Sequence, residues 1–188
     1  MLFLAVAMPR NIEIKARVSD IATMRAKAAA AADNGPLEIF QDDTFFACPN
    51  GRLKLRMFSA EKGELIFYRR PDQAGPKESF YLITPTTTPD LLRETMAGAY
   101  GEIGRVRTQR TLFLKGPTRI HLDAVEGLGD FLELEVVLDN QADPDPRVGE
   151  RRARELMDAL GVDPKDLIEG AYLDLLRRSA SSGRDEHS

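Results

Sequence analysis

Apolar and polar residues alternate along much of the chain, and the alternation is clearest near its start. Ile12 and Ile14 alternate there with Glu13, Lys15 and Arg17. A period of two is typical of a β-strand with one buried face, because successive side chains point to opposite sides. The same pattern, with turn residues between its repeats, predicts strands at residues 11–18, 37–47, 52–58, 64–70, 77–84, 104–114, 118–125 and 130–138.

The connections between these segments are short, and helical patterns interrupt them at only a few places. Residues 49–51 (PNG) contain Asn-Gly, a strong hairpin signal. Helices are predicted at residues 19–32 with Ser19 as cap, from Pro89 after Thr88, at 147–160, and from Asp163 or Asp166 to about residue 178. Short connections favour antiparallel pairing, whereas a parallel sheet would need a helix after most strands. We therefore predict an α+β fold in which helices surround an eight-stranded antiparallel β-barrel.

Composition and charge narrow the class of protein. The 188 residues suit one domain, and 43% hydrophobic with 30% charged residues is an ordinary globular balance. A net charge of −4 argues against a nucleic-acid or membrane-surface binder. Cys48 is the only cysteine, which excludes a disulfide framework and indicates a cytoplasmic protein. The first seven residues are apolar but far short of the roughly 20 needed to span a bilayer.

The chain is expected to divide into three parts. Met8 looks like a second start codon, so residues 1–8 are interpreted as an N-terminal extension. Residues 9–178 form the predicted domain, and the small, polar residues 179–188 are predicted to be a disordered tail.

The polar faces of the predicted strands carry particular charged residues. Side chains two apart share a face, which groups Glu13 with Lys15, Lys54 with Arg56, Tyr68 with Arg70, Lys77 with Ser79 and Tyr81, Arg119 with His121 and Asp123, and Glu133 with Glu135. A solvated face explains any one of these rows. As a set, they also fit a charged interior, with the cations Lys15, Lys54, Arg56, Arg70, Lys77, Arg110 and Arg119 against four acids.

The paired carboxylates are candidates for a metal site. Glu133 and Glu135 lie in an apolar strand and would be costly to bury without a cation or an arginine. Mg²⁺ takes oxygen ligands and commonly bridges carboxylates to a phosphate. Glu133, Glu135 and Asp123, with Glu13 opposite, are therefore candidates for one or two such ions, and the cations for phosphate oxygens.

Two neighbouring polar features have plainer interpretations. His121 is interpreted as a hydrogen-bonded structural histidine rather than a group that activates a nucleophile. Asp42 and Asp43 are interpreted as a turn or the start of a strand rather than as ligands.

Short motifs along the chain resemble those of the CYTH domain, named for bacterial class IV adenylate cyclases and animal thiamine triphosphatases. They lie at residues 11–15 (NIEIK), 41–46 (QDDTFF), 51–56 (GRLKLR), 68–70 (YRR), 77–79 (KES), 105–110 (RVRTQR), 118–123 (TRIHLD), 126–129 (EGLG) and 131–135 (FLELE). Any one motif is short, but their shared order makes chance a poor explanation, and the flanks look most like the cyclase branch. The resemblance covers roughly residues 9–176.

This resemblance implies a triphosphate tunnel with Mg²⁺ or Mn²⁺ as cofactor. It implies metal ligands at Glu13, Asp123, Glu133 and Glu135, and catalytic cations at Lys15 and Arg110. It also implies substrate-binding residues at Lys54, Arg56, Arg70, Lys77 and Arg119.

Two residues depart from the family pattern. Asn11 stands where the family has the first glutamate of E-x-E-x-K, so a carbonyl oxygen replaces a carboxylate there. Thr108 stands where cyclases of the family often carry a lysine. Both changes weigh against efficient cyclase chemistry and leave the tunnel, the expected metal ligands and most of the expected phosphate ligands in place.

Several functions remain open at this stage. The first is a cyclase that converts ATP to cyclic AMP and pyrophosphate, and the second is a phosphohydrolase that acts on tripolyphosphate or an organic triphosphate. A non-catalytic polyphosphate or nucleotide sensor would use the same residues. A barrel for an apolar ligand is the weakest option, because charged rows stand where aliphatic ones would be needed. The expected partner is a nucleoside or inorganic triphosphate, without nucleic acid or membrane, and a homodimer stays an option.

Overall fold

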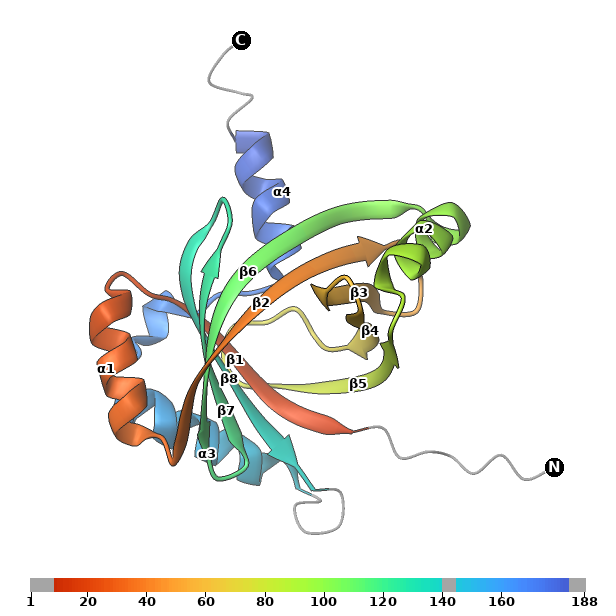
Figure 1. The fold of residues 1–188 in the computed structure, drawn as a ribbon. Coiled ribbons are helices and arrows are strands. Elements are labelled where there is room, and N and C mark those ends of the chain that lie inside the picture. The colour runs from red at the N-terminus through yellow and green to blue at the C-terminus, as the bar shows by residue number, and fades with distance from the viewer. Residues whose placement is uncertain (1–8, 140–144, 183–188) are drawn as a thin grey trace, which may run out of the picture.

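Eight antiparallel strands close into a barrel in the computed structural model, which describes residues 9–139 and 145–182 (Figure 1). The strands are β1 (Arg10–Arg17), β2 (Asn34–Phe46), β3 (Arg52–Ser59), β4 (Lys62–Arg69), β5 (Lys77–Thr86), β6 (Glu102–Lys115), β7 (Thr118–Val125) and β8 (Gly129–Leu138). They follow one another around the ring in the order β1-β5-β4-β3-β2-β6-β7-β8, and β1 pairs with β8 to complete it. The predicted fold class is confirmed.

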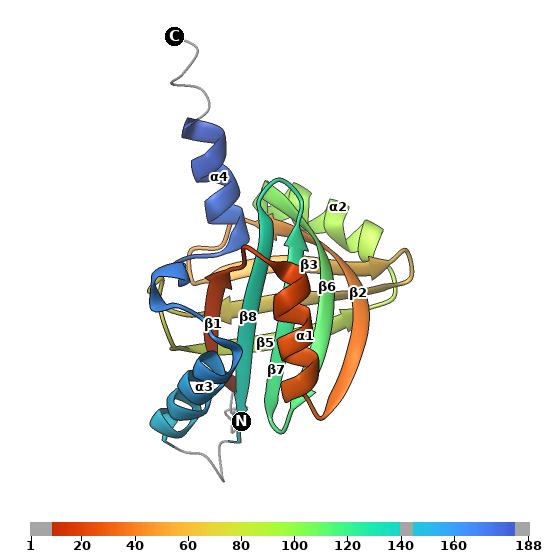
Figure 2. The ribbon, with the colours of Figure 1, turned by 90° about the vertical axis from the view of Figure 1, so that its left-hand side faces the viewer.

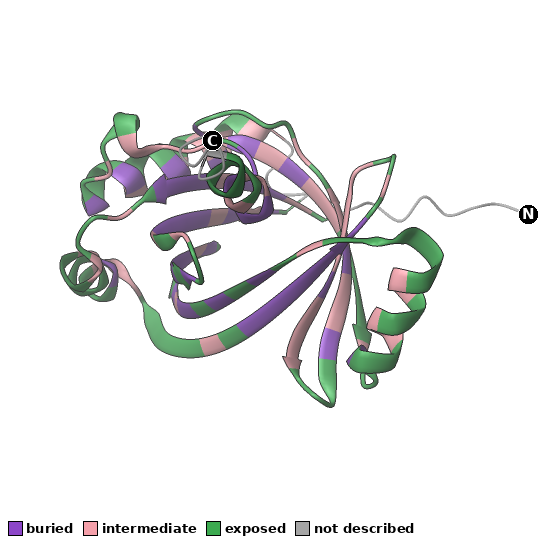
Figure 3. Ribbon diagram, turned by 90° about the horizontal axis from the view of Figure 1, so that it is seen from above, coloured by how far each residue is buried: buried purple, intermediate pink, exposed green. Residues whose placement is uncertain are grey.

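At β1 and β8 the alternation separates an apolar outer face from a charged inner face. The outer face of β1 and β8 includes Ile12, Ile14, Leu132 and Leu134, each at most 1% exposed. This face is covered by α1 (Ile21–Ala31) and α3 (Pro146–Leu160), which Figure 2 shows in front of the strands. Figure 3 shows the buried positions running along the strands, while α1 is largely exposed. The polar positions of β1 and β8 that include Glu13, Lys15, Glu133 and Glu135 therefore face the barrel interior.

The helix starts follow the expected capping chemistry, with one shift at α1. Asp20 rather than Ser19 caps α1, and its Oδ1 accepts a hydrogen bond from the backbone N–H of Thr23 at 3.0 Å. The helix α2 (Pro89–Tyr100) begins at the predicted proline, at the far end of the barrel from α1 and α3 (Figure 1). At its C-terminus α3 ends at Gly161, whose φ of 71° suits glycine.

The predicted start of the last helix was wrong. Asp163 caps only a short 3₁₀ turn (Pro164–Asp166), and α4 (Tyr172–Ser182) begins later. The intervening backbone pairs with β1 instead, through a bridge between Ala16 and Leu167 and a 2.9 Å bond from the N–H of Ile168 to the carbonyl of Lys15. Tertiary pairing therefore overrides the local helix signal.

The helix α4 closes one end of the barrel and reaches into the predicted tail. Tyr172, Leu173 and Leu175 form a core cluster with barrel residues that include Phe45 and Phe131. Because α4 runs to Ser182, residues 179–182 are helical. Residues 183–188 of the predicted tail and the predicted extension 1–8 lie outside the described residues. Among the helices in the described part of the chain, none is long and apolar enough to cross a membrane.

Candidate functional site

The barrel encloses a cavity of about 370 Å³ that is lined by side chains from all eight strands. Ala171 and Tyr172, at the start of α4, line the cavity at one end. The charged residues of the lining are Glu13, Lys15, Asp43, Lys54, Arg56, Glu64, Arg70, Arg110, Arg119, Glu133 and Glu135. Six cations and five acids thus share one space, which is the arrangement that the charged strand faces suggested.

Most of the residues predicted for the site lie on this cavity. Lys77 and Asp123 are the exceptions, because both are buried but are not part of the described lining. The ammonium of Lys77 donates to the carbonyl of Gln73 at 3.1 Å. Burial and the positive charge of Arg70 lower the pKa of Lys77 to about 8. The roles assigned to these residues stay predictions.

Arg110 is the centre of a buried ion network at the cavity wall. Its guanidinium donates two hydrogen bonds to Asp123, at 2.7 and 2.6 Å, and one to Glu133 at 2.8 Å. Glu133 also pairs with Lys15 at 3.1 Å, and the hydroxyl of Tyr172 donates to Asp123 at 2.8 Å. Burial alone would raise the pKa of Glu133, but Lys15 and Arg110 hold it well below its usual value. Asp123 therefore orients Arg110 from behind the cavity.

A second group joins the adjacent strands β2 and β3 on the cavity wall. Asp43 accepts hydrogen bonds from Lys54 at 2.7 Å and from Arg56 at 2.8 Å through each of two nitrogens. Burial and the neighbouring charge of Arg56 lower the pKa of Lys54 to about 8. The side chains of Lys54 and Arg56 keep 14% and 16% of their surface exposed, so both remain accessible from the cavity.

A third pair lies close to the end that α4 covers. Arg70 donates to Glu13 at 2.9 Å and to the carbonyl of Gly170 at 3.0 Å, which ties the strand ends to the covering segment. The ammonium of Lys15 stands 3.6 Å from the centre of the Tyr172 ring. Burial raises the pKa of Glu13, because Arg70 only partly offsets it and other carboxylates of the lining add to it.

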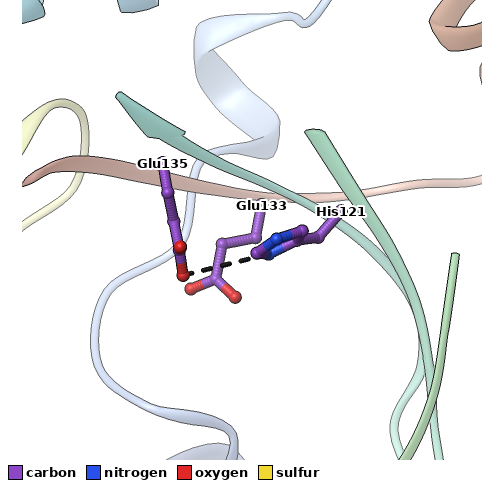
Figure 4. A group of neighbouring side chains, drawn as sticks. All are labelled: His121, Glu133 and Glu135. Atoms are coloured by element: carbon purple, nitrogen blue, oxygen red, sulfur yellow. Dashed lines mark ion pairs between the residues drawn. The ribbon is translucent and has the colours of Figure 1, made fainter. Parts of the chain in front are cut away.

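Glu133 and Glu135 lie close enough to His121 for the three side chains to share a divalent cation. Ligand atoms of His121, Glu133 and Glu135 lie within 4.8 Å of one another (Figure 4). Asn11 also lines the cavity, and its Oδ1 is buried without a hydrogen-bond partner in the part of the chain that the structure describes. Carboxylate and amide oxygens are ligands that Mg²⁺ and Mn²⁺ accept. The donor set therefore fits a divalent ion held by Glu133 and Glu135, with Glu13 nearby on β1 opposite Glu135.

Two acids of the lining were missed in the sequence. Asp43 and its neighbour Asp42 lie inside β2, so the interpretation of this pair as a turn or strand start was wrong. Asp43 faces inward, opposite Arg56, while Asp42 binds Arg105 on the other face. Glu64, on β4, is the second missed acid. Alternation across residues 41–45 was the available signal for Asp43, since Gln41, Asp43 and Phe45 share a face.

The fold and site together define a β-tunnel protein with paired acids and bases inside. The CYTH domain model matches residues 9–172, and the chain belongs to the CYTH family. Over 178 residues, 90% of each chain, it is 25% identical to the adenylate cyclase CyaB of Aeromonas hydrophila.

Solved structures share the fold. The PH1012 protein of Pyrococcus horikoshii OT3 superimposes with a TM-score of 0.76 at 22% identity, covering 88% of this chain and 99% of that one. Hippeastrum HpAC1 superimposes with a TM-score of 0.64 at 16% identity, covering 90% of this chain and 96% of that one. HpAC1 is described as a candidate adenylyl cyclase with a dominant triphosphatase activity.

Proposed function

We propose that this chain is a divalent-metal-dependent enzyme that acts on an organic triphosphate, with the conversion of ATP to cyclic AMP and pyrophosphate as its reaction. The observation that carries the proposal is the cavity itself, where Lys54, Arg56 and Arg119 share one space with Glu133 and Glu135. Such a lining suits a polyanion that arrives together with its metal ions. The similarity to CyaB of Aeromonas hydrophila supports the choice of reaction.

Cations from different strands would bind different sides of the triphosphate. Lys54 and Arg56 extend from β3, and Arg119 from β7, so a triphosphate between them is held from two sides. Arg110 and Lys15 line the same cavity, where both are paired with Glu133. Glu13, Glu133 and Glu135 would hold the divalent ion. When bound, such an ion neutralises charge on the phosphates and favours deprotonation of the attacking hydroxyl.

An apolar wall at one end of the cavity favours an organic substrate over an inorganic one. Ile39, Phe58, Ile66 and Ile83 line the cavity, and Ile66 stands directly opposite Ile83. Ile39 lies six residues before Phe45 on β2, about 20 Å along the strand from the end that α4 covers. Inorganic tripolyphosphate has no group to bury there, whereas a nucleobase has.

Hydrolysis of the triphosphate is the second candidate reaction. Asn11 lines the cavity with an amide where the family has a carboxylate, so one negative charge and one candidate base are missing. A nucleophile other than the ribose hydroxyl, namely water, is then the simplest alternative, and HpAC1 of Hippeastrum provides a precedent within this fold.

A product assay distinguishes these reactions. Purified protein is incubated with Mg²⁺ or Mn²⁺ and, separately, with ATP, thiamine triphosphate and tripolyphosphate. Cyclic AMP with pyrophosphate establishes the cyclase, and orthophosphate establishes the hydrolase. Tight binding without turnover indicates a sensor and refutes both enzyme proposals.

The apolar wall has its own test. Phe58→Ala should raise KM for ATP several-fold and leave KM for tripolyphosphate unchanged, because only the organic group contacts that wall. Phe67→Ala is the control, since Phe67 lies next to Ile66 on the opposite face of β4 and outside the described cavity lining. Equal effects of Phe58→Ala on both substrates would contradict this assignment.

A further inference from the structure

His121 lies among the acids of the proposed metal site. It stands directly opposite Glu133 on the neighbouring strand, and Glu135 follows two residues later on the same face. Figure 4 shows the imidazole and the two carboxylates converging on one point. Their ligand atoms lie within 4.8 Å of one another, a spacing that a single ion can bridge.

The imidazole has a ring nitrogen without a hydrogen-bond partner. Nδ1 is buried and accepts or donates no hydrogen bond among the described residues, and the side chain is only 5% exposed. The Glu135 carboxylate oxygen is 3.8 Å away, which is beyond hydrogen-bonding distance. Buried polar atoms are almost always satisfied, so a ring nitrogen without a partner beside two carboxylates is available to bind an ion.

Glu133 and Glu135 differ in the ion pairs that they already form. Glu133 pairs with both Lys15 and Arg110, whereas Glu135 meets Arg119 at 3.2 Å, and that arginine is 43% exposed. Glu135 is therefore the carboxylate with the weaker ion pairing, and it is the one that lies 3.8 Å from the Nδ1 of His121. An ion there would satisfy both Glu135 and His121.

The type of donor determines which ion is preferred. Mg²⁺ takes oxygen ligands almost exclusively, while imidazole suits transition metals, and Mn²⁺ accepts mixed nitrogen and oxygen sets. We propose that His121 supplies a nitrogen ligand beside Glu133 and Glu135 and makes this site prefer Mn²⁺ to Mg²⁺. The inference rests on the metal dependence of the proposed function and adds the residue that sets the choice of ion.

Pulsed electron paramagnetic resonance of bound Mn²⁺ tests the coordination directly. The spectrum is recorded with Mn²⁺ alone and with Mn²⁺ plus tripolyphosphate, which contains no nitrogen. The wild-type protein should show strong coupling to a directly bound ¹⁴N nucleus. His121→Gln should lose this coupling, and His187→Gln, which removes the only other histidine, should retain it.

Affinity measurements separate coordination from a structural role. His121→Gln should weaken Mn²⁺ binding at least about tenfold and change Mg²⁺ binding by less than about threefold. Equal losses for both ions, or wild-type Mn²⁺ bound through oxygen alone, would overturn the inference and leave the proposed enzyme intact. A wild-type protein that binds neither ion would overturn both. The wild-type spectrum decides the question even if the variant does not fold.

Discussion

Replacement of Arg110 by methionine should destabilise the protein strongly. The guanidinium donates three hydrogen bonds to Asp123 and Glu133 and is 6% exposed, while the side chain of Asp123 is fully buried. In Arg110→Met the apolar volume is kept, but Asp123 retains only the hydroxyl of Tyr172 as a side-chain partner among the described contacts. Removing one partner of a buried ion pair costs roughly 3–5 kcal/mol, because an uncompensated charge is left inside.

The measurement is urea unfolding at pH 7.5, supported by thermal melting. A loss of about 3–5 kcal/mol corresponds to a melting temperature lowered by about 6–20 °C in a chain of this size. Arg119→Met is the matched control, because Arg119 is 43% exposed and meets Glu135 at 3.2 Å. A pair with one partner exposed to solvent contributes less than a buried one, and exposed pairs are worth up to about 1 kcal/mol. If the two variants lost the same stability, the reasoning would be refuted.

The pH dependence of this loss follows from the direction of the pKa shifts. Burial raises the pKa of Asp123, but Arg110 outweighs it, so the pKa lies below its usual value in the folded protein. Stability from a carboxyl with a lowered pKa is present above the unfolded pKa and is lost as the pH falls through the folded one. The gap between wild type and Arg110→Met should therefore be full at neutral pH and should narrow below about pH 4.

Three further predictions address the site and the packing around it. Glu133→Gln combined with Glu135→Gln should abolish turnover through lost metal binding, and unchanged rates in a product assay would contradict the proposed ligands. Because the pKa of Lys54 is lowered to about 8 by burial and Arg56, kcat/KM for the triphosphate should fall by up to about tenfold per pH unit above pH 8. Lys54→Arg should move that fall to higher pH, and an unshifted profile would assign it to another group. Gly149→Ala should cost roughly 1–2 kcal/mol in urea unfolding, because its Cβ would stand 2.6 Å from Ile12 and overpacking outweighs the helix propensity gained; a more stable variant would show that α3 can shift away from the barrel.

Strands such as β1 and β7 could be predicted because apolar and polar residues alternate along them, and β7 matches residues 118–125 without any shift. A single strand could not show whether its polar face points into the barrel or toward solvent, because both cases have the same period. The polar face points inward because the sheet closes into a barrel, in which β1 pairs with both β5 and β8. The predicted start of α4 was wrong for a related reason. Leu167 pairs with Ala16, about 150 positions away, and local sequence does not reveal such a contact.

Alternation shows which face of a strand a residue lies on, but it does not show how far along the tunnel the residue lies. His121 and Asp123 differ in this position. Both side chains share the inner face of β7, and the sequence favoured Asp123 as a metal ligand and His121 as a structural residue. Two residues advance a strand by about 6.6 Å, which places Asp123 opposite Phe131 toward the end that α4 covers and His121 opposite Glu133. Asp123 is therefore buried with Arg110 and Tyr172, while His121 meets the carboxylates at the cavity. Asp123 thus contacts a cation at the cavity wall, while the Nδ1 of His121, without a hydrogen-bond partner among the described residues, lies beside the carboxylates.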